Sequence, residues 1–151
     1  GTPDPAFSNL GRGVLDLSLP GGGSDQELLS KALLLPDGKL LAAGQIRAFV
    51  TVGTADLLLM RIQTNGEPDS SYGNGGARRL VLGQGSEAVS SLLGLPDGHV
   101  LLFADDPQGP GSSDNFVPTM LRLTTTGDPD PGFAAVRHEF TPGIGSDRSF
   151  Q

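Results

Sequence analysis

Three short landmarks recur in the same order along the chain, at a period of about 60 residues. In the first landmark, a Gly opens a segment in which an Asp precedes an aromatic residue by three positions. The second is Leu-Pro-Asp-Gly followed by apolar residues, and the third is an Arg between apolar residues. The copies are Gly1–Phe7, Gly66–Tyr72 and Gly127–Phe133; Leu35–Leu41 and Leu95–Leu101; Met60–Ile62 and Leu121–Leu123. This recurrence indicates repeats over residues 1–65 and 66–126 and a partial third repeat over 127–151.

Each repeat is expected to form four short antiparallel strands joined by turns. The chain has 23 Gly and 12 Pro among 151 residues, which leaves no room for long helices. Pro-Asp-Gly suits a tight hairpin turn, so Asp37, Gly38, Asp97 and Gly98 are expected structural positions. The expected strands are residues 14–19, 28–35, 39–44 and 57–64 in the first repeat, 77–82, 88–95, 99–104 and 119–126 in the second, and 136–140 in the third.

This accounting predicts an all-β fold of β-propeller-like blades, about two and a third of them. A β-solenoid is the alternative, although its period is usually shorter. Leu33–Leu35 and Leu57–Leu59 are continuous apolar runs, typical of strands covered on both faces. Propellers usually need about four to eight blades to close a ring. The chain begins with Gly1, and we expect either further repeats in a longer chain or a homo-oligomer that completes the ring.

Charge and composition disfavour several classes of partner. Ten Lys and Arg against 17 Asp and Glu give a net charge of −7, with no basic stripe, so nucleic acid is not an expected partner. No apolar run approaches the roughly 20 residues that span a bilayer. The chain has no Cys, which excludes disulfides, thiolate nucleophiles and Cys-ligated metal sites.

The landmarks resemble the bacterial delta-60 repeat, a β-propeller repeat of otherwise uncharacterised proteins. The resemblance is clearest in Gly66–Gly76 and in Pro36–Lys39. The first repeat departs from the pattern at Ser8–Gly13, the second has His99 in place of Lys, and the third keeps only Asp130 and Phe133. The resemblance implies a propeller fold and carries no catalytic residues with it.

The Asp that precedes an aromatic residue has two interpretations. A ring of such carboxylates suits calcium or a sugar, whereas an Asx turn would use the side chain to bond its own backbone. In the second interpretation the aromatic ring fills the space between blades. Recurrence in every repeat favours this structural role. The pairs are Asp4 with Phe7, Asp69 with Tyr72, and Asp130 with Phe133.

Arg61 and Arg122 are unusual because each lies within an apolar strand. One interpretation is a guanidinium that faces a ligand near the central channel and binds a carboxylate or phosphate. The other is a solvent-facing residue, or an ion pair between blades with a turn Asp. The second interpretation is favoured.

The most distinctive segment outside the repeat is the acidic loop over residues 105–115. Its oxygen-bearing side chains are the ligands that calcium prefers, but their spacing matches neither an EF-hand nor an RTX repeat. An acidic insertion is the favoured interpretation. Its counterpart, residues 45–56, contains Arg47, and loops at this place are candidates for a binding rim. The weak ligand-binding candidates are Asp105, Asp106, Asp114, Asn115 and Arg47.

The pattern favours a non-enzymatic repeat module of a secreted or surface-exposed bacterial protein, which binds or scaffolds a protein or glycan. No nucleophile elbow and no phosphate-binding glycine loop occurs in the chain. The alternative is a hydrolase or lyase that uses carboxylates at the propeller mouth. No cofactor is expected, calcium being the one considered.

Overall fold

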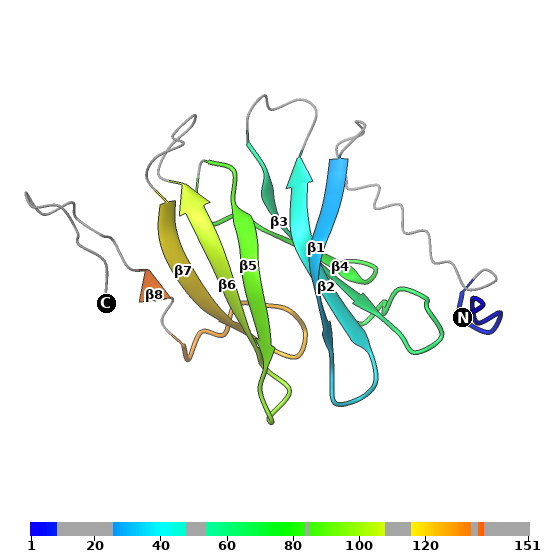
Figure 1. The fold of residues 1–151 in the computed structure, drawn as a ribbon. Coiled ribbons are helices and arrows are strands. Elements are labelled where there is room, and N and C mark those ends of the chain that lie inside the picture. Colours follow the sequence, from blue (N-terminus) through cyan, green and yellow to red (C-terminus); the bar gives the residue numbers. More distant parts are fainter. Residues whose placement is uncertain (9–25, 48–53, 84, 108–115, 134–135, 138–151) are drawn as a thin grey trace, which may run out of the picture.

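The computed structural model describes residues 1–8, 26–47, 54–83, 85–107, 116–133 and 136–137. These residues form two four-stranded antiparallel sheets and contain no helix (Figure 1). The first sheet has the order β1 (Gln26–Leu34), β2 (Leu40–Arg47), β3 (Asp56–Ile62) and β4 (Ala77–Leu80). The second has the order β5 (Ala88–Gly94), β6 (Val100–Pro107), β7 (Phe116–Leu123) and β8 (Val136–Arg137). The prediction of four-stranded antiparallel blades is confirmed.

The sheets are offset from the sequence repeats by one strand. We expected the strand at 77–82 to join the three strands that follow it, but β4 pairs with β3, with Ala77 opposite Met60. The reason is the tight turn after β3, which reverses the chain and lets Arg61 donate its backbone N–H to the Gly76 carbonyl at 2.8 Å. β8 pairs with β7 in the same way. The expected strand at 14–19 lies outside the described residues.

Both hairpins close with the same Pro-Asp-Gly turn. The Gly38 N–H donates to the Leu35 carbonyl at 3.0 Å, and the Gly98 N–H donates to the Leu95 carbonyl at the same distance. Gly38 and Gly98 have φ values of +82° and +84°, which residues with a Cβ rarely adopt. The Asp37 and Asp97 carboxylates accept the N–H two residues on, each at 3.1 Å. Both turns lie at the lower end in Figure 1.

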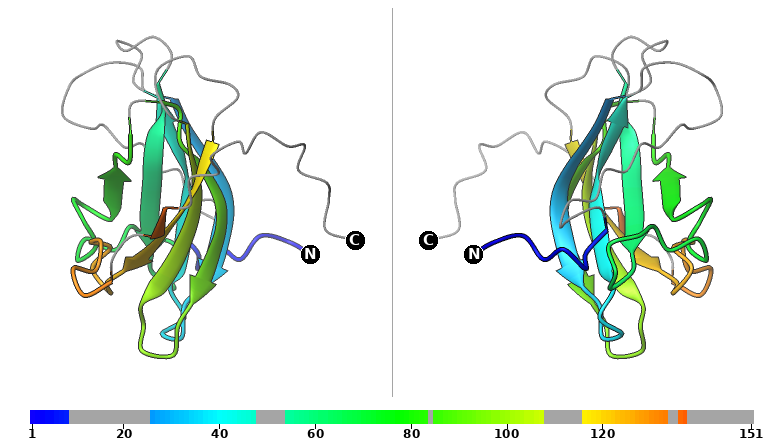
Figure 2. Two further views of the ribbon diagram at one scale, coloured as in Figure 1. Left: turned by 90° about the vertical axis from the view of Figure 1, so that its left-hand side faces the viewer. Right: turned by 90° about the vertical axis from the view of Figure 1, so that its right-hand side faces the viewer.

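The core lies between the two sheets. Alternate residues of the central strands face it, as the period-two geometry of a strand requires, and β1 lies against β5. In Figure 2, β1 and β4 lie on opposite edges of the first sheet. The nine core residues on the four central strands are Leu41, Ala43, Leu57, Leu59, Val100, Leu102, Ala104, Leu121 and Leu123.

The two predicted apolar runs, Leu57–Leu59 and Leu33–Leu35, differ in how far they are buried. Leu57, Leu58 and Leu59 are fully buried, as predicted, because β3 is a central strand with packed side chains on both faces. The same prediction is wrong for Leu33–Leu35, since Leu34 is 68% exposed. β1 is the edge strand of its sheet, so only one of its faces reaches the core.

Candidate functional site

Every copy of the Asp landmark folds into the same turn. The Asp side chain accepts a hydrogen bond from the backbone N–H of the residue two positions on. The backbone carbonyl of the same Asp accepts one from the N–H of the aromatic residue. This is the geometry of an Asx turn, so the Asp oxygens that recur in every copy accept hydrogen bonds from the backbone of their own turn. The side-chain bonds are Ala6 to Asp4 at 2.9 Å, Ser71 to Asp69 at 3.1 Å, and Gly132 to Asp130 at 2.8 Å.

In the second copy of the turn, Asp69 is the centre of a cluster of charged groups. Its Oδ2 atom accepts from Lys39 Nζ at 2.8 Å and from Arg61 Nε at 2.7 Å. Its Oδ1 atom accepts from the Ser71 hydroxyl at 2.7 Å. The Lys39 ammonium and the Ser71 hydroxyl hold the pKa of the Asp69 carboxyl well below its usual range. The cluster joins the first hairpin, β3 and the turn, all within one blade.

Asp130 has matching partners in the second blade. Arg122 Nε lies 2.7 Å from Asp130 Oδ2, and His99, which replaces Lys39, places Nε2 3.8 Å away. The Gly132 backbone N–H and the Arg122 guanidinium lower the pKa of Asp130. Arg61 and Arg122 therefore each pair with the turn Asp of their own blade.

We expect Asp69→Asn to lower the free energy of unfolding by about 1–3 kcal/mol at neutral pH. Asn keeps an acceptor for Ser71 but loses the charge that faces Lys39 and Arg61. The carboxylate contributes above the ordinary aspartate pKa of 3.8 and the contribution is lost in more acidic solution. The difference in free energy of unfolding between variant and parent, measured by urea denaturation, should therefore become smaller as the pH falls below that value. Asp4→Asn, in the exposed copy of the turn, is the control; an equal loss there would contradict the charge argument.

The Asp69 turn also makes the joint between the blades. The Tyr72 ring lies against Gly127, where an added Cβ would come 2.6 Å from the Tyr72 hydroxyl. The Arg61 guanidinium lies over this ring, 4.7 Å from its centroid, and donates through Nη1 to the Thr125 carbonyl of the next blade. We expected the aromatic residue to fill the space between blades, but we did not predict that its ring would lie against the Gly that opens the next landmark. The sequence signal that could have indicated this contact is the recurrence of that Gly in each landmark.

A cavity of about 280 Å³ opens at this joint, between the two hairpin turns. Its lining includes Arg61, Tyr72 and the turn carboxylates Asp37 and Asp97, together with apolar residues such as Leu41. The Tyr72 hydroxyl is buried and has no hydrogen-bond partner within the described residues. Burial raises the pKa of Tyr72 to about 12, so the phenol stays neutral near pH 7. The buried hydroxyl lies against Gly127 and is closed to a ligand, so the polar groups that the cavity offers are the exposed carboxylates of the two hairpin turns.

The structure separates the acidic ligand candidates. Asp105 and Asp106 are neighbours in β6, so their side chains point to opposite faces of the sheet. Asp105 accepts from the Ser90 hydroxyl at 2.5 Å on one face, while Asp106 is fully buried beside Gly83. Asp114 and Asn115 lie outside the described residues. Arg47 is exposed at the end of β2 in the other sheet.

Glu87 is not among the predicted site residues, yet it is fully buried where the chain passes from the first sheet to the second. Its Oε1 atom accepts the N–H groups of Leu82 and Gly83 at 2.9 and 2.8 Å. Its own N–H donates to the Ala55 carbonyl at 2.8 Å, which ties the passage to the first blade. Oε2 has no hydrogen-bond partner in the described part of the chain. Burial raises the pKa of Glu87. A lone Glu before a strand carries no sequence signal of burial.

Glu87→Gln is expected to change how stability depends on pH. Because the folded protein holds the Glu87 proton more tightly than the unfolded chain, the free energy of unfolding falls as pH rises above the ordinary pKa of 4.5. The amide is neutral throughout and keeps an oxygen for Leu82 and Gly83, so the variant should lose that fall. Urea denaturation between pH 4.5 and neutrality measures it, with exposed Glu67→Gln as the control. Parallel pH profiles for Glu87→Gln and the parent would contradict this.

Two searches of the described residues were negative. They contain no group of three or more His, Asp or Glu side chains arranged to hold a metal ion. They also contain no helix with the length and apolar character to cross a membrane.

Comparison with known proteins bears on the fold. Residues 35–72 match a family model described as a domain of unknown function (DUF5122) β-propeller. The matched segment runs from the first hairpin turn through β2 and β3 to Tyr72, and so contains the Asp69 cluster. No curated protein and no solved structure matches the chain. Over the matched segment the chain is similar to a β-propeller repeat of unknown function, in agreement with its four-stranded blades.

Proposed function

We propose that this chain is a non-enzymatic β-propeller repeat module of the delta-60 type, which scaffolds or binds a protein or glycan. The observation that carries the proposal is the use of the repeated residues. Asp69 and Arg61 hold a turn within one blade, and Tyr72 and Arg61 attach that blade to the next. The residues that recur in each repeat thus hold the turn of a blade and join that blade to the next.

The chemistry of the described residues favours binding over catalysis. A carboxylate-based hydrolase or lyase needs two acids in one cleft. Asp105 and Asp106 face opposite sides of β6, and the Asp37 and Asp97 carboxylates that line the cavity are each held by their own hairpin turn through a bond from the N–H two residues on. The nitrogens of Arg61 are engaged by Asp69, Ser71 and Thr125. The exposed carboxylates of Asp37 and Asp97, which line the cavity, are acceptors for sugar hydroxyls or peptide N–H groups.

The proposal includes a setting and partners. The resemblance to the bacterial delta-60 repeat and the net charge of −7 support a secreted or surface-exposed bacterial protein. Further repeats of a longer chain, or further copies of this one, would complete the ring, because two blades leave sheet faces and edges unpaired.

Two measurements on the full chain test the function. On an array of glycans we expect binding that Asp37→Asn weakens, since the Asp37 carboxylate lines the cavity and is half exposed; binding to no glycan would overturn the glycan part of the proposal. With a panel of glycoside and ester substrates we expect no turnover. Turnover that Asp105→Asn abolishes would overturn the non-enzymatic assignment.

A further inference from the structure

Residues 1–8 occupy a place on the first blade that matches the joint between the two blades. The Phe7 ring lies against Gly66, where an added Cβ would come 2.9 Å from Phe7 Cδ1 and Cε1. The Ser8 N–H donates to the Asn65 carbonyl at 2.6 Å. Tyr72 lies against Gly127 in the same manner. Residues 1–8 therefore imitate the turn of a preceding blade, seated on the glycine turn of the blade that follows.

The second blade carries the same turn without a glycine turn against it. Within the described residues, no glycine lies against the Phe133 ring as Gly66 lies against Phe7. Arg122 pairs with Asp130 as Arg61 pairs with Asp69, but its Cζ atom is 6.0 Å from the Phe133 centroid. In the internal joint the corresponding distance is 4.7 Å. Phe133 and its turn are thus formed but lack the contact that Tyr72 makes.

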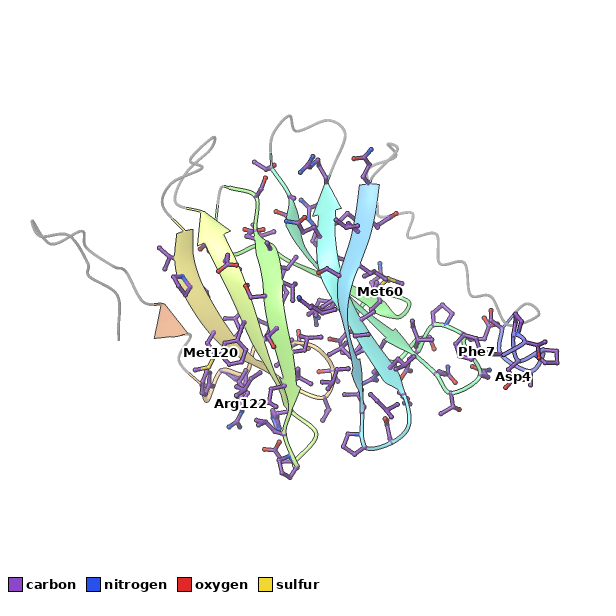
Figure 3. All side chains as sticks on the ribbon, viewed as in Figure 1. Asp4, Phe7, Met60, Met120 and Arg122 are labelled. Carbon is purple, nitrogen blue, oxygen red and sulfur yellow. The ribbon has the colours of Figure 1, made fainter. Side chains whose placement is uncertain are left out.

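The two halves of this joint have matching sequences. Gly1–Phe7 and Gly127–Phe133 share Gly, Pro, Asp, Pro and Phe at corresponding positions. The segment from the second blade therefore fits the place that residues 1–8 hold on Asn65–Gly66. The two halves also lie at opposite ends of the molecule, as the positions of Phe7 and Arg122 in Figure 3 show.

One ion pair of the internal joint has no counterpart in the joint between copies. In the internal joint, Arg78 of the first blade pairs with Asp128, the residue after Gly127. The corresponding residue after Gly66 is Glu67, which is exposed. In the second blade Val136 pairs with Met120 as Arg78 pairs with Leu59 in the first, so a docking copy brings no matching cation to Glu67 and the joint between copies rests on the ring and the glycine turn.

We propose that Gly127–Phe133 of one copy of this chain docks on the Asn65–Gly66 turn of a second copy and displaces residues 1–8 of that copy. The copies then associate head to tail, with Phe133 against Gly66 as Tyr72 is against Gly127. Such a heterologous contact forms rings when its rotation closes, which is what a propeller requires. The proposal deepens the proposed function and rests on the chain being part of a larger propeller.

Residues 1–8 regulate this docking. Residues 1–6 are exposed, and the segment is held chiefly through Phe7 and Ser8. A tethered segment competes with a second copy at an effective concentration of about millimolar. Loosening the segment is therefore expected to strengthen association.

The test is the mass of the full-length Phe7→Ala chain in solution, followed by light scattering from micromolar to millimolar concentration. We expect association at least about tenfold stronger than that of the parent, because the competing segment is released. Phe7→Tyr should behave like the parent, since Tyr72 shows that a tyrosine fits the same place. The double variant Phe7→Ala/Phe133→Ala should lose the gain.

A second variant releases residues 1–8 in a different way and controls for effects that are specific to Phe7→Ala. Ser8 has a φ of +48° and donates its N–H to Asn65, so Ser8→Pro removes the donor and excludes that backbone conformation. It should associate like Phe7→Ala. A folded Phe7→Ala or Ser8→Pro chain whose mass matches the parent at every concentration would overturn the proposal, as would association that survives Phe133→Ala. Neither outcome depends on the glycan array or the substrate panel, so the two proposals fail separately.

Discussion

Gly127→Ala is expected to lower the free energy of unfolding by about 2–5 kcal/mol. Two costs combine at this position. Gly127 has a φ of +85°, and placing a residue with a Cβ there costs about 1–2 kcal/mol. The new methyl group would also overlap the Tyr72 ring, and overpacking of this kind costs typically about 1–3 kcal/mol. The Tyr72 ring is 2% exposed and lies under the Arg61 guanidinium, so turning it away from the new methyl group would break the contacts that hold it.

Gly75→Ala separates the two costs. Gly75 has a φ of +63°, but a Cβ built there meets no atom within 4 Å, so this variant carries only the conformational cost. Urea denaturation of both variants and the parent gives the difference that belongs to the joint. Equal losses in the two variants would contradict the overlap of the new methyl group with the Tyr72 ring.

Leu102→Ala should lower the free energy of unfolding by about 2–5 kcal/mol. Leu102 is fully buried in β6 and faces the core between the sheets, which also contains Leu41 and Leu59 of the first blade. Removing three carbon atoms there leaves a cavity that both blades line. Since the core is shared, we expect the two sheets to unfold in one transition, before and after the substitution.

The matched control is Leu93→Ala in the adjacent strand β5. Leu93 is 52% exposed, so its truncation should cost within about 0.5–1 kcal/mol. Far-UV circular dichroism follows both sheets, and Tyr72 fluorescence follows the joint, because Tyr72 is the chain's one tyrosine. Two separate transitions in Leu102→Ala would contradict a shared core.

Local residue chemistry made much of the fold predictable. Pro-Asp-Gly at 36–38 and 96–98 closes hairpins because glycine accepts the positive φ that such a turn needs. The runs of apolar residues located the strands. The strand at 77–80 was also located, but its partner was not, because a period shows which segments are alike and not which segments are hydrogen-bonded.

The candidate site was predictable to a smaller degree. The turn Asp positions and Arg61 were found because they recur, and recurrence indicated a structural use. Glu87 does not recur, and its burial depends on how the chain crosses from one sheet to the other. Asp105 and Asp106 looked like one acidic group in sequence, while strand alternation sends them to opposite faces.

The sequence by itself determined the repeat, the strand-forming segments and the turns, since each depends on a few neighbouring residues and their backbone preferences. Only the tertiary structure decided which strand closes each blade, that Tyr72 lies against Gly127, and that residues 1–8 occupy Gly66. Those features depend on contacts between residues about 55 or more positions apart or on the choice of strand partner. No local preference of the chain encodes such contacts, because they form only when the blades pack together.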